Sequence, residues 1–208
     1  MTTRAKIQPS SASTSEVAKK ISLEQYFDLE MNAETRNEYV NGHIQAMAYT
    51  TVEHCQVVTN LLRLLGNCVL DTEYDVFAND RMLYTEKCGQ VFYPDLMIVC
   101  EKPLYKLYKK SMKATLNPSV LIEVLSDSTY DYDRIDKWAC YKQIPSLKQY
   151  ILVSQKSKGV EMRNRTDDNN WQHEILGSET EKIQIGDCEI SFKDIYHKVT
   201  IKPLKETR

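Results

Sequence analysis

The sequence predicts an α/β fold with a mixed central β-sheet flanked by helices and by additional β-hairpins. Two apolar runs, VLIEVLS at 120–126 and LKQYILVSQ at 147–155, have the composition of buried strands, and a helical pattern at 130–143 separates them. A strand, a helix and a second strand in this order form a parallel βαβ unit. The dipeptide Asn-Gly at 41–42 lies between two short strand-like runs and predicts a two-residue antiparallel hairpin. Parallel and antiparallel pairs together make the sheet mixed.

Helices are expected on two faces of this sheet. Residues 51–70 carry apolar side chains at helical spacing, which predicts a long helix with a broad buried face. The helix at 130–143 is expected on another face, and Ser22 suits the N-cap of a short helix where the domain begins. Further strands are expected at YDVFAN (74–79), RMLYT (81–85), FYPDLMIVC (92–100), GVEMRNR (159–165) and WQHEIL (171–176), followed by a last pair of short strands and a helical turn at FKDIY (192–196).

Length and composition limit the class of protein. The 208 residues suit a flexible Ser/Thr-rich tail at 1–20 followed by a single domain at 21–208. A net charge of -2 argues against a surface that is basic throughout, so any contact with nucleic acid must come from a local patch. No apolar run approaches the ~20 residues that cross a bilayer, and we expect no membrane contact.

The cysteines favour a reducing compartment. There are six of them, Cys55, Cys68, Cys88, Cys100, Cys140 and Cys188, and none forms a C-x-x-C pair. Scattered cysteines in apolar runs are typical of free core thiols. We therefore expect a cytoplasmic protein with neither a disulfide framework nor a zinc site.

Two acidic residues interrupt apolar strands. Side chains alternate along a strand, so Glu123 shares a face with Leu121 and Leu125. Asp95 interrupts the predicted strand at 92–100 in the same way. If the two strands are neighbours, their carboxylates converge and suit Mg²⁺ or Mn²⁺, which prefer oxygen ligands. The alternative is that each acid lies near a strand end, where it caps a helix or pairs with Arg or Lys.

Three motifs that carry acidic and basic residues follow one another along the chain. They are Pro94-Asp95, EVLS at 123–126, and a helical segment with Asp133, Arg134, Lys137 and Tyr141. Around them stand EYVNGHIQAM at 38–47, SLKQYILVSQ at 146–155 and ISFKDIY at 190–196. Over about residues 22–196 the sequence therefore resembles the Uma family (second Uma type) of proposed restriction endonucleases, within the PD-(D/E)XK nuclease superfamily.

The resemblance implies a restriction-endonuclease-like fold and a nuclease that uses Mg²⁺ or Mn²⁺. It implies that Asp95 and Glu123 bind the metal and that Glu38 is a further acidic member of the catalytic site. One position departs from the superfamily pattern, because Leu125 stands two residues after Glu123, where a lysine is expected. The missing amine must come from elsewhere, or the site is weakened.

Lys137 is the expected substitute for that lysine. At helical spacing it shares a face with Asp133, Cys140, Tyr141 and Ile144, and this partly apolar face would turn the amine towards a cleft. There the amine would orient or activate the attacking water and stabilise charge that develops on the phosphate. The alternative is a solvated Asp133–Lys137 pair, worth only ~0.3–0.5 kcal/mol.

Three further residues are candidates for lining the site. His54 lies in the first turn of the long helix and either approaches the site or bonds a backbone carbonyl as a structural histidine. Asp133 and Tyr141 lie on the same helix face as Lys137, and Tyr141 has packing as its alternative role.

A lysine-rich segment lies between the two acidic strands. Residues 101–113 hold Tyr105 and Tyr108 among lysines, of which Lys106, Lys109, Lys110 and Lys113 are the predicted nucleic-acid-binding residues. Lysines neutralise phosphates without reading sequence, and tyrosine rings offer stacking faces. The alternative is an ordinary solvated surface helix or loop.

These observations lead to one functional hypothesis and one alternative. The first is a Mg²⁺-dependent endonuclease that hydrolyses phosphodiester bonds in DNA, with homodimerisation as a natural way to cut two strands. The alternative is a catalytically inactive nucleic-acid-binding or interaction protein on a nuclease scaffold, which Leu125 in the lysine position motivates.

Overall fold

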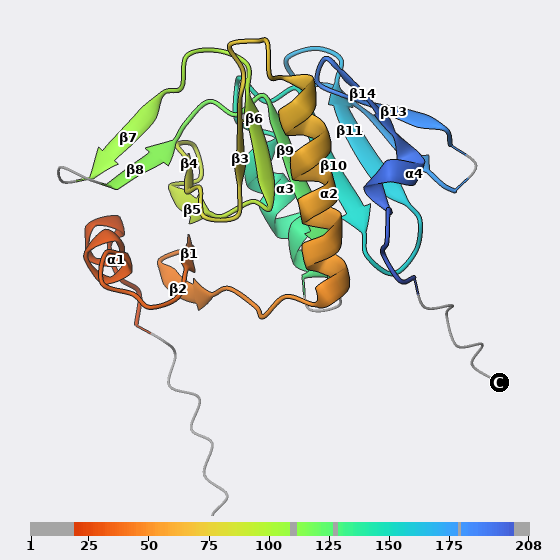
Figure 1. Ribbon diagram of the computed structural model, residues 1–208. Coiled ribbons are helices and arrows are strands. Elements are labelled where there is room, and N and C mark those ends of the chain that lie inside the picture. Colours follow the sequence, from red (N-terminus) through yellow and green to blue (C-terminus); the bar gives the residue numbers. More distant parts are fainter. Residues whose placement is uncertain (1–18, 109–111, 127–128, 179, 202–208) are drawn as a thin grey trace, which may run out of the picture.

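The computed structural model describes residues 19–108, 112–126, 129–178 and 180–201 (Figure 1). Within these ranges the strands form two six-stranded sheets and one two-stranded sheet. The elements are α1 (Leu23–Glu30), β1 (Asn37–Val40), β2 (His43–Ala46), α2 (Val52–Cys68), β3 (Asp75–Ala78), β4 (Leu83–Thr85), β5 (Gln90–Phe92), β6 (Leu96–Val99), β7 (Tyr105–Tyr108), β8 (Met112–Thr115), β9 (Val120–Leu125), the π-helix η1 (Tyr132–Lys137), α3 (Trp138–Tyr141), β10 (Gln149–Ser154), β11 (Val160–Arg165), β12 (Trp171–Leu176), β13 (Lys182–Ile185), β14 (Cys188–Ser191) and α4 (Phe192–Ile195).

The sheet that contains β9 has the order β12-β11-β10-β9-β6-β3. Strands β9 and β10 are parallel, with Glu123 opposite Leu152, and β6 pairs with β9 in the antiparallel sense. The predicted βαβ unit and the mixed sheet are therefore confirmed. Strand β6, which follows Asp95, and strand β9, which contains Glu123, are therefore neighbours. The predicted convergence of the two carboxylates requires this arrangement.

The two helices lie on opposite faces of this central sheet, as predicted. On one face, Leu61 and Leu65 of α2 pack with Ile122 of β9 and with β13, β14 and α4. On the other face, Tyr141 of α3 packs with Leu121 and with Leu125. Alternation along β9 thus sends successive side chains into two different cores.

A second six-stranded sheet, with the order β2-β1-β5-β4-β8-β7, was not expected from the sequence. The predicted strand at 92–100 is one reason, because it divides into β5 and β6, which belong to different sheets. The break falls at residues 93–95, where Pro94 has no N–H to donate to a ladder. Asp95 consequently lies just before β6 and not within a strand, which corrects the prediction that it interrupts one.

The predicted helix cap at Ser22 and the predicted hairpin at Asn41-Gly42 are confirmed. Ser22 and Gln25 form a reciprocal capping box on α1. Asn41 and Gly42 have φ angles of 53° and 89° and connect β1 to β2 as the predicted hairpin. Residues 1–18 of the predicted tail lie outside the described residues, and the single domain at 21–208 stays a prediction. In the described part of the chain, every helix is too short or too polar to cross a membrane.

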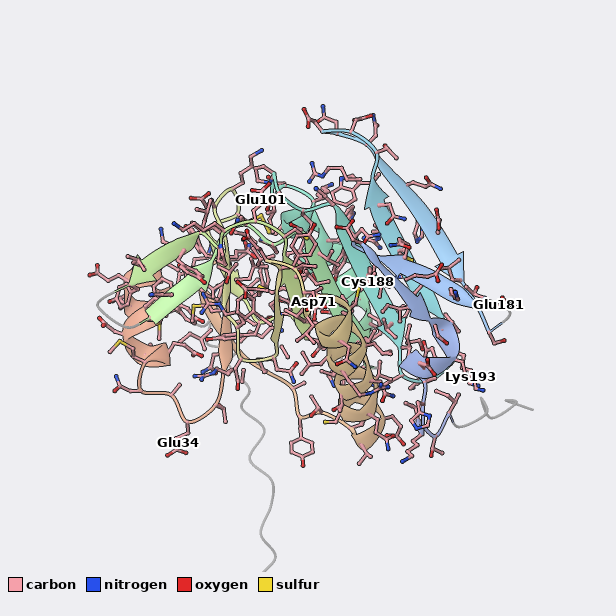
Figure 2. The ribbon with its side chains drawn as sticks, turned by 45° about the horizontal axis from the view of Figure 1, so that its top comes forward. Glu34, Asp71, Glu101, Glu181, Cys188 and Lys193 are labelled. Atoms are coloured by element: carbon pink, nitrogen blue, oxygen red, sulfur yellow. A yellow bond between two sulfur atoms is a disulfide. The ribbon has the colours of Figure 1, made fainter. Side chains whose placement is uncertain are left out.

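The prediction that disulfides are absent is wrong. Cys68 forms a disulfide with Cys188 (Figure 2, where Cys188 is labelled), and Cys88 forms one with Cys140. The partners are 120 and 52 residues apart in sequence, so spacing could not reveal that α2 meets β14 or that α3 meets the β4–β5 turn. Cys55 and Cys100 are free thiols, as expected.

Tyr196 gives the fold a pH-dependent contribution that can be measured. Its buried hydroxyl donates to Gly159 O at 2.8 Å, and burial raises the pKa of the phenol well above its ordinary value. A phenol with a raised folded pKa stabilises the fold fully below the unfolded pKa of about 10, and this stability is lost as pH rises above it. In urea unfolding, we expect the wild type to lose about 1.4 kcal/mol per pH unit more than Tyr196→Phe above pH ~10. Parallel pH profiles for the two proteins would contradict this assignment.

Candidate active site

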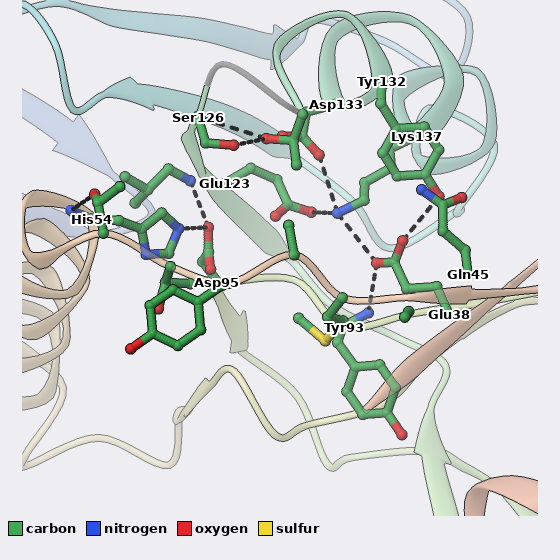
Figure 3. Close-up of a pocket in the computed structure, with 18 residues that line it drawn as sticks. Glu38, Gln45, His54, Tyr93, Asp95, Glu123, Ser126, Tyr132, Asp133 and Lys137 are labelled. Carbon is green, nitrogen blue, oxygen red and sulfur yellow. Dashed lines mark hydrogen bonds and ion pairs between the residues drawn. The ribbon is translucent and has the colours of Figure 1, made fainter. Parts of the chain in front are cut away.

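One cavity of about 290 Å³ brings together side chains that lie far apart in the sequence (Figure 3). Its lining includes six residues that the sequence singled out, namely Glu38, His54, Asp95, Glu123, Asp133 and Lys137. Tyr141 does not line the cavity, but its hydroxyl donates a hydrogen bond to Glu123. Glu38 comes from β1 of the second sheet and Glu123 from β9 of the central sheet, so both sheets contribute to the site.

Asp95 is fixed by two donors from different elements. Its Oδ2 atom accepts a hydrogen bond from Val124 N of β9 at 2.7 Å and lies 3.1 Å from His54 Nε2 of α2. His54 is itself placed by the start of α2, where its N–H donates to the N-cap Thr51. His54 Nδ1 is buried and has no hydrogen-bond partner among the described residues. The histidine therefore approaches the site and holds Asp95, and no backbone carbonyl of the described residues accepts a hydrogen bond from its ring.

Glu123 lies in the middle of β9 and is only 3% exposed. Its Oε1 atom accepts from Lys137 Nζ at 3.1 Å and from Tyr141 OH at 3.0 Å. Burial raises the pKa of Glu123 well above its ordinary value, although the Lys137 ammonium opposes this shift. Among the described residues, none donates a hydrogen bond to Oε2, which leaves one carboxylate oxygen free to take another ligand.

The Lys137 ammonium is surrounded by carboxylates. Its Nζ lies 3.1 Å from Glu123 Oε1, 3.1 Å from Asp133 Oδ1 and 3.3 Å from Glu38 Oε1. Burial favours the neutral amine, but the carboxylates of Glu123 and Glu38 outweigh it, and the pKa of Lys137 is raised well above its ordinary value. The predicted Asp133–Lys137 pair exists, but it is buried and not solvated. The arrangement supplies a permanent positive charge rather than a neutral base.

The helix that carries Lys137 presents the face that the sequence predicted. Asp133, Lys137, Cys140, Tyr141 and Ile144 are all buried. Its first part, however, is the π-helix η1, in which main-chain hydrogen bonds span five residues instead of four. Sequence patterning does not show this change of geometry, because the buried positions fit an ordinary α-helix equally well.

Tyr132 is a site residue that the sequence did not indicate. Its hydroxyl donates to Glu38 Oε2 at 2.9 Å, while Glu38 Oε1 accepts from Tyr93 N at 3.2 Å. The N–H of Tyr93 can donate to Glu38 because the chain leaves the strand ladder at the break before β6. On an α-helix, Tyr132 would face away from Lys137, since the two residues are five apart. The place of Tyr132 in the site depends on the π turn, which the sequence does not predict.

The cavity is rich in carboxyl groups. Four carboxyl groups line the cavity, those of Asp95, Glu123, Glu38 and Asp133, together with one lysine. The Lys137 ammonium pairs with the last three of them. Asp95 and Glu123 offer the hard oxygen donors that Mg²⁺ and Mn²⁺ take, and Mg²⁺ keeps several waters when only one or two carboxylates bind it. Within the described ranges, no three His, Cys, Asp or Glu side chains converge closely enough to enclose an ion by themselves. A metal bound by Asp95 and Glu123 would therefore need water or substrate oxygens to complete its coordination.

The described lysines of the predicted patch lie outside this cavity. Lys106 of β7 and Lys113 of β8 do not line it, and their amines lie over the rings of Tyr84 and Tyr105 at 4.4 and 5.5 Å. The two strands pair in the antiparallel sense, which differs from the helix or loop that the alternative interpretation supposed. Tyr108 is stacked on Phe27, so its ring is already occupied. Lys109 and Lys110 fall outside the described residues, and binding of nucleic acid by this hairpin stays a prediction.

Comparison with known families decides the identity of the chain. The Uma2 family, described as "Putative restriction endonuclease", matches residues 23–189. The chain belongs to the Uma2 family. This match confirms the resemblance that the motifs around Asp95, Glu123 and Lys137 indicated.

Relatives and a solved structure are consistent with membership of the Uma2 family. The Synechocystis sp. protein sll1609, named as uncharacterized, is 32% identical over 78% of this chain and 92% of its own length. A second uncharacterized Synechocystis sp. protein, slr1290, is 28% identical over 73% of this chain and 78% of its own. A crystal structure from Anabaena variabilis, titled a "putative nuclease belonging to DUF820", has a TM-score of 0.66 at 14% identity and covers 85% of this chain and 98% of its own. That likeness confirms the predicted nuclease-like α/β fold.

Proposed function

We propose that this Uma2 protein is a metal-dependent endonuclease that hydrolyses phosphodiester bonds in DNA. The observation that carries the proposal is the meeting of Asp95, Glu123 and Lys137 in one acidic cavity, with one oxygen of Glu123 free. A bound Mg²⁺ or Mn²⁺ would lower the pKa of a water and polarise a phosphate oxygen. Asp95 and Glu123 would hold that ion.

The remaining side chains have distinct roles in this proposal. The Lys137 ammonium orients the attacking water and stabilises negative charge on the phosphate. Glu38 and Asp133 keep Lys137 charged, and Tyr141 holds the Glu123 carboxylate in place. His54 and Val124 N orient Asp95. Each of these contacts is made before substrate arrives, which is how preorganised sites reduce the cost of reaction.

The surroundings of Leu125 favour an active nuclease over a catalytically inactive protein with the same fold. Leu125 is buried in the same core as Tyr141 of α3, on the face of β9 where Glu123 lies. Lys137 reaches Glu123 from the helix that covers this face. The amine that the strand lacks is thus supplied from the neighbouring helix. A charged lysine at Leu125 itself would have to enter an apolar core.

The experiment is a cleavage assay with the full chain. Supercoiled plasmid and matched single-stranded and double-stranded DNA and RNA oligonucleotides are incubated with Mg²⁺, Mn²⁺ or EDTA. We expect DNA to be cut with Mg²⁺ or Mn²⁺ and to stay intact with EDTA. DNA that is bound but never cut, with either metal, would instead favour the inactive binding protein. Sedimentation on and off DNA tests the predicted homodimer in the same preparations.

A further inference from the structure

The π turn decides which side chains reach the cavity. In an α-helix, residues three and four apart share a face, whereas the bonds of a π turn bring residues five apart together. Lys137 Nζ lies 5.4 Å from the centre of the Tyr132 ring, five residues earlier. The hydroxyl of Tyr132 donates to Glu38 Oε2, and the amine of Lys137 lies 3.3 Å from Glu38 Oε1. The π geometry therefore lets both side chains hold one carboxylate.

Two carbonyl groups of this turn accept hydrogen bonds from the central sheet. Tyr150 of β10 donates through its hydroxyl to Asp133 O at 2.9 Å, and Arg163 of β11 donates through Nη1 to Arg134 O at 3.1 Å. Neither donor lines the cavity, and Tyr150 is fully buried. A side chain that inserts into the main-chain ladder of a helix is a recognised cause of departure from α geometry.

The second donor is itself held firmly. Glu161 Oε1 accepts from Arg163 Nε at 3.2 Å and from Nη2 at 2.8 Å, while Glu161 Oε2 lies 2.7 Å from Arg134 Nη1. The guanidinium of Arg163 also lies over the Trp138 ring at 4.7 Å. Both the carbonyl and the side chain of Arg134 are thus tied to β11, so the turn is anchored to a rigid strand.

We propose that Tyr150 and Arg163 are positioning residues for the catalytic lysine. Their hydrogen bonds to Asp133 O and Arg134 O stabilise the π turn over the α-helix and so bring Lys137 and Tyr132 to the carboxylates. This inference rests on the proposed nuclease function for its kinetic consequences. Its structural consequence, the geometry of η1, can be tested whether or not the protein cuts DNA.

The test replaces Tyr150 with phenylalanine, which removes one hydroxyl and keeps the ring. We expect kcat to fall about 10- to 100-fold, since small misplacements of catalytic groups have effects of this size, and KM to change by less than about twofold. A crystal structure of Tyr150→Phe is expected to show an α turn at 132–137 and Tyr132 withdrawn from Glu38. Tyr196→Phe is the matched control, because it also removes a buried hydroxyl that donates to a carbonyl, and its kcat should stay near that of the wild type.

A second variant tests the inference if Tyr150→Phe does not fold. Arg163→Lys keeps a positive charge beside Glu161 but lacks the planar guanidinium that reaches Arg134 O, and it should reduce kcat in the same direction. The inference is overturned if Tyr150→Phe keeps the π turn, or if it loses the turn and retains the kcat of Tyr196→Phe. If the wild type cuts no DNA, the proposed function fails, and the crystal structure of Tyr150→Phe alone decides whether the tyrosine holds the turn.

Discussion

Replacing Asp95 with asparagine is expected to reduce DNA cleavage about 1000-fold, because a bound metal ion supplies several kcal/mol of transition-state stabilisation and each 1.36 kcal/mol is tenfold in rate. Asparagine keeps the shape of the side chain and an oxygen that can accept from Val124 N, so the fold should persist. What is lost is the negative charge that would hold Mg²⁺. The measurement is single-turnover cleavage of an oligonucleotide with saturating Mn²⁺.

The controls for this result are a second site variant and a matched surface variant. Glu123→Gln should cause a loss of similar size, since it removes the other proposed ligand. Asp187→Asn makes the same chemical change at an exposed residue that accepts a hydrogen bond from Tyr74 and does not line the cavity, and it should leave the rate unchanged. Cleavage that survives in both Asp95→Asn and Glu123→Gln would remove these carboxylates from the chemistry.

Replacing Lys137 with methionine is expected to abolish cleavage and to cost about 3–5 kcal/mol of unfolding free energy at neutral pH, because removing one partner leaves buried charges uncompensated. The ammonium lies within 3.3 Å of the carboxylates of Glu38, Glu123 and Asp133. Burial already raises the pKa of Glu123 and of Asp133 in the wild type. Without Lys137, which opposes both shifts, the two pKa values must rise further.

The pH dependence of that loss has a definite sign. A carboxyl with a raised folded pKa favours the fold below its unfolded pKa of about 4, and that contribution is lost as pH rises through the folded value. The deficit of Lys137→Met should therefore be small near pH 4 and grow towards neutral pH in urea unfolding. Adding Glu123→Gln to Lys137→Met should recover part of the stability, since it removes one of the buried carboxylates that the loss of Lys137 leaves uncompensated. A Lys137→Met protein as stable as the wild type at neutral pH would mean that the buried charge network contributes little.

Much of the fold follows from periodicities that the sequence displays. The alternation along β9 and the helical spacing in α2 correctly assigned Glu123 and Leu61 to their faces, and the motif order correctly indicated the family. The second sheet was missed because pairing between distant short strands leaves no periodic signal. Pro94 was the available clue, since it marks the point where one apparent strand becomes two.

The candidate site, like the fold, could be predicted from the sequence only in part. Asp95, Glu123 and Lys137 could be named because carboxylates among apolar residues and a lysine on a partly apolar helix face are visible in sequence. Tyr132 could not be named, because its place depends on a π turn that hydrogen bonds from Tyr150 and Arg163 accompany. The disulfide partners were hidden for a related reason, since three-dimensional closeness over 52 or 120 residues has no local signature.

The central claim is that Asp95 and Glu123 together bind a divalent cation beside Lys137. Crystals of the wild type soaked in Mn²⁺ and measured at an anomalous wavelength test this claim most directly. We expect one anomalous peak within bonding distance of a carboxylate oxygen from each of the two residues, and none in Asp95→Asn crystals soaked in the same way. Wild-type crystals that carry no peak in this cavity at saturating Mn²⁺, with Lys137 still paired to Glu123, would contradict it.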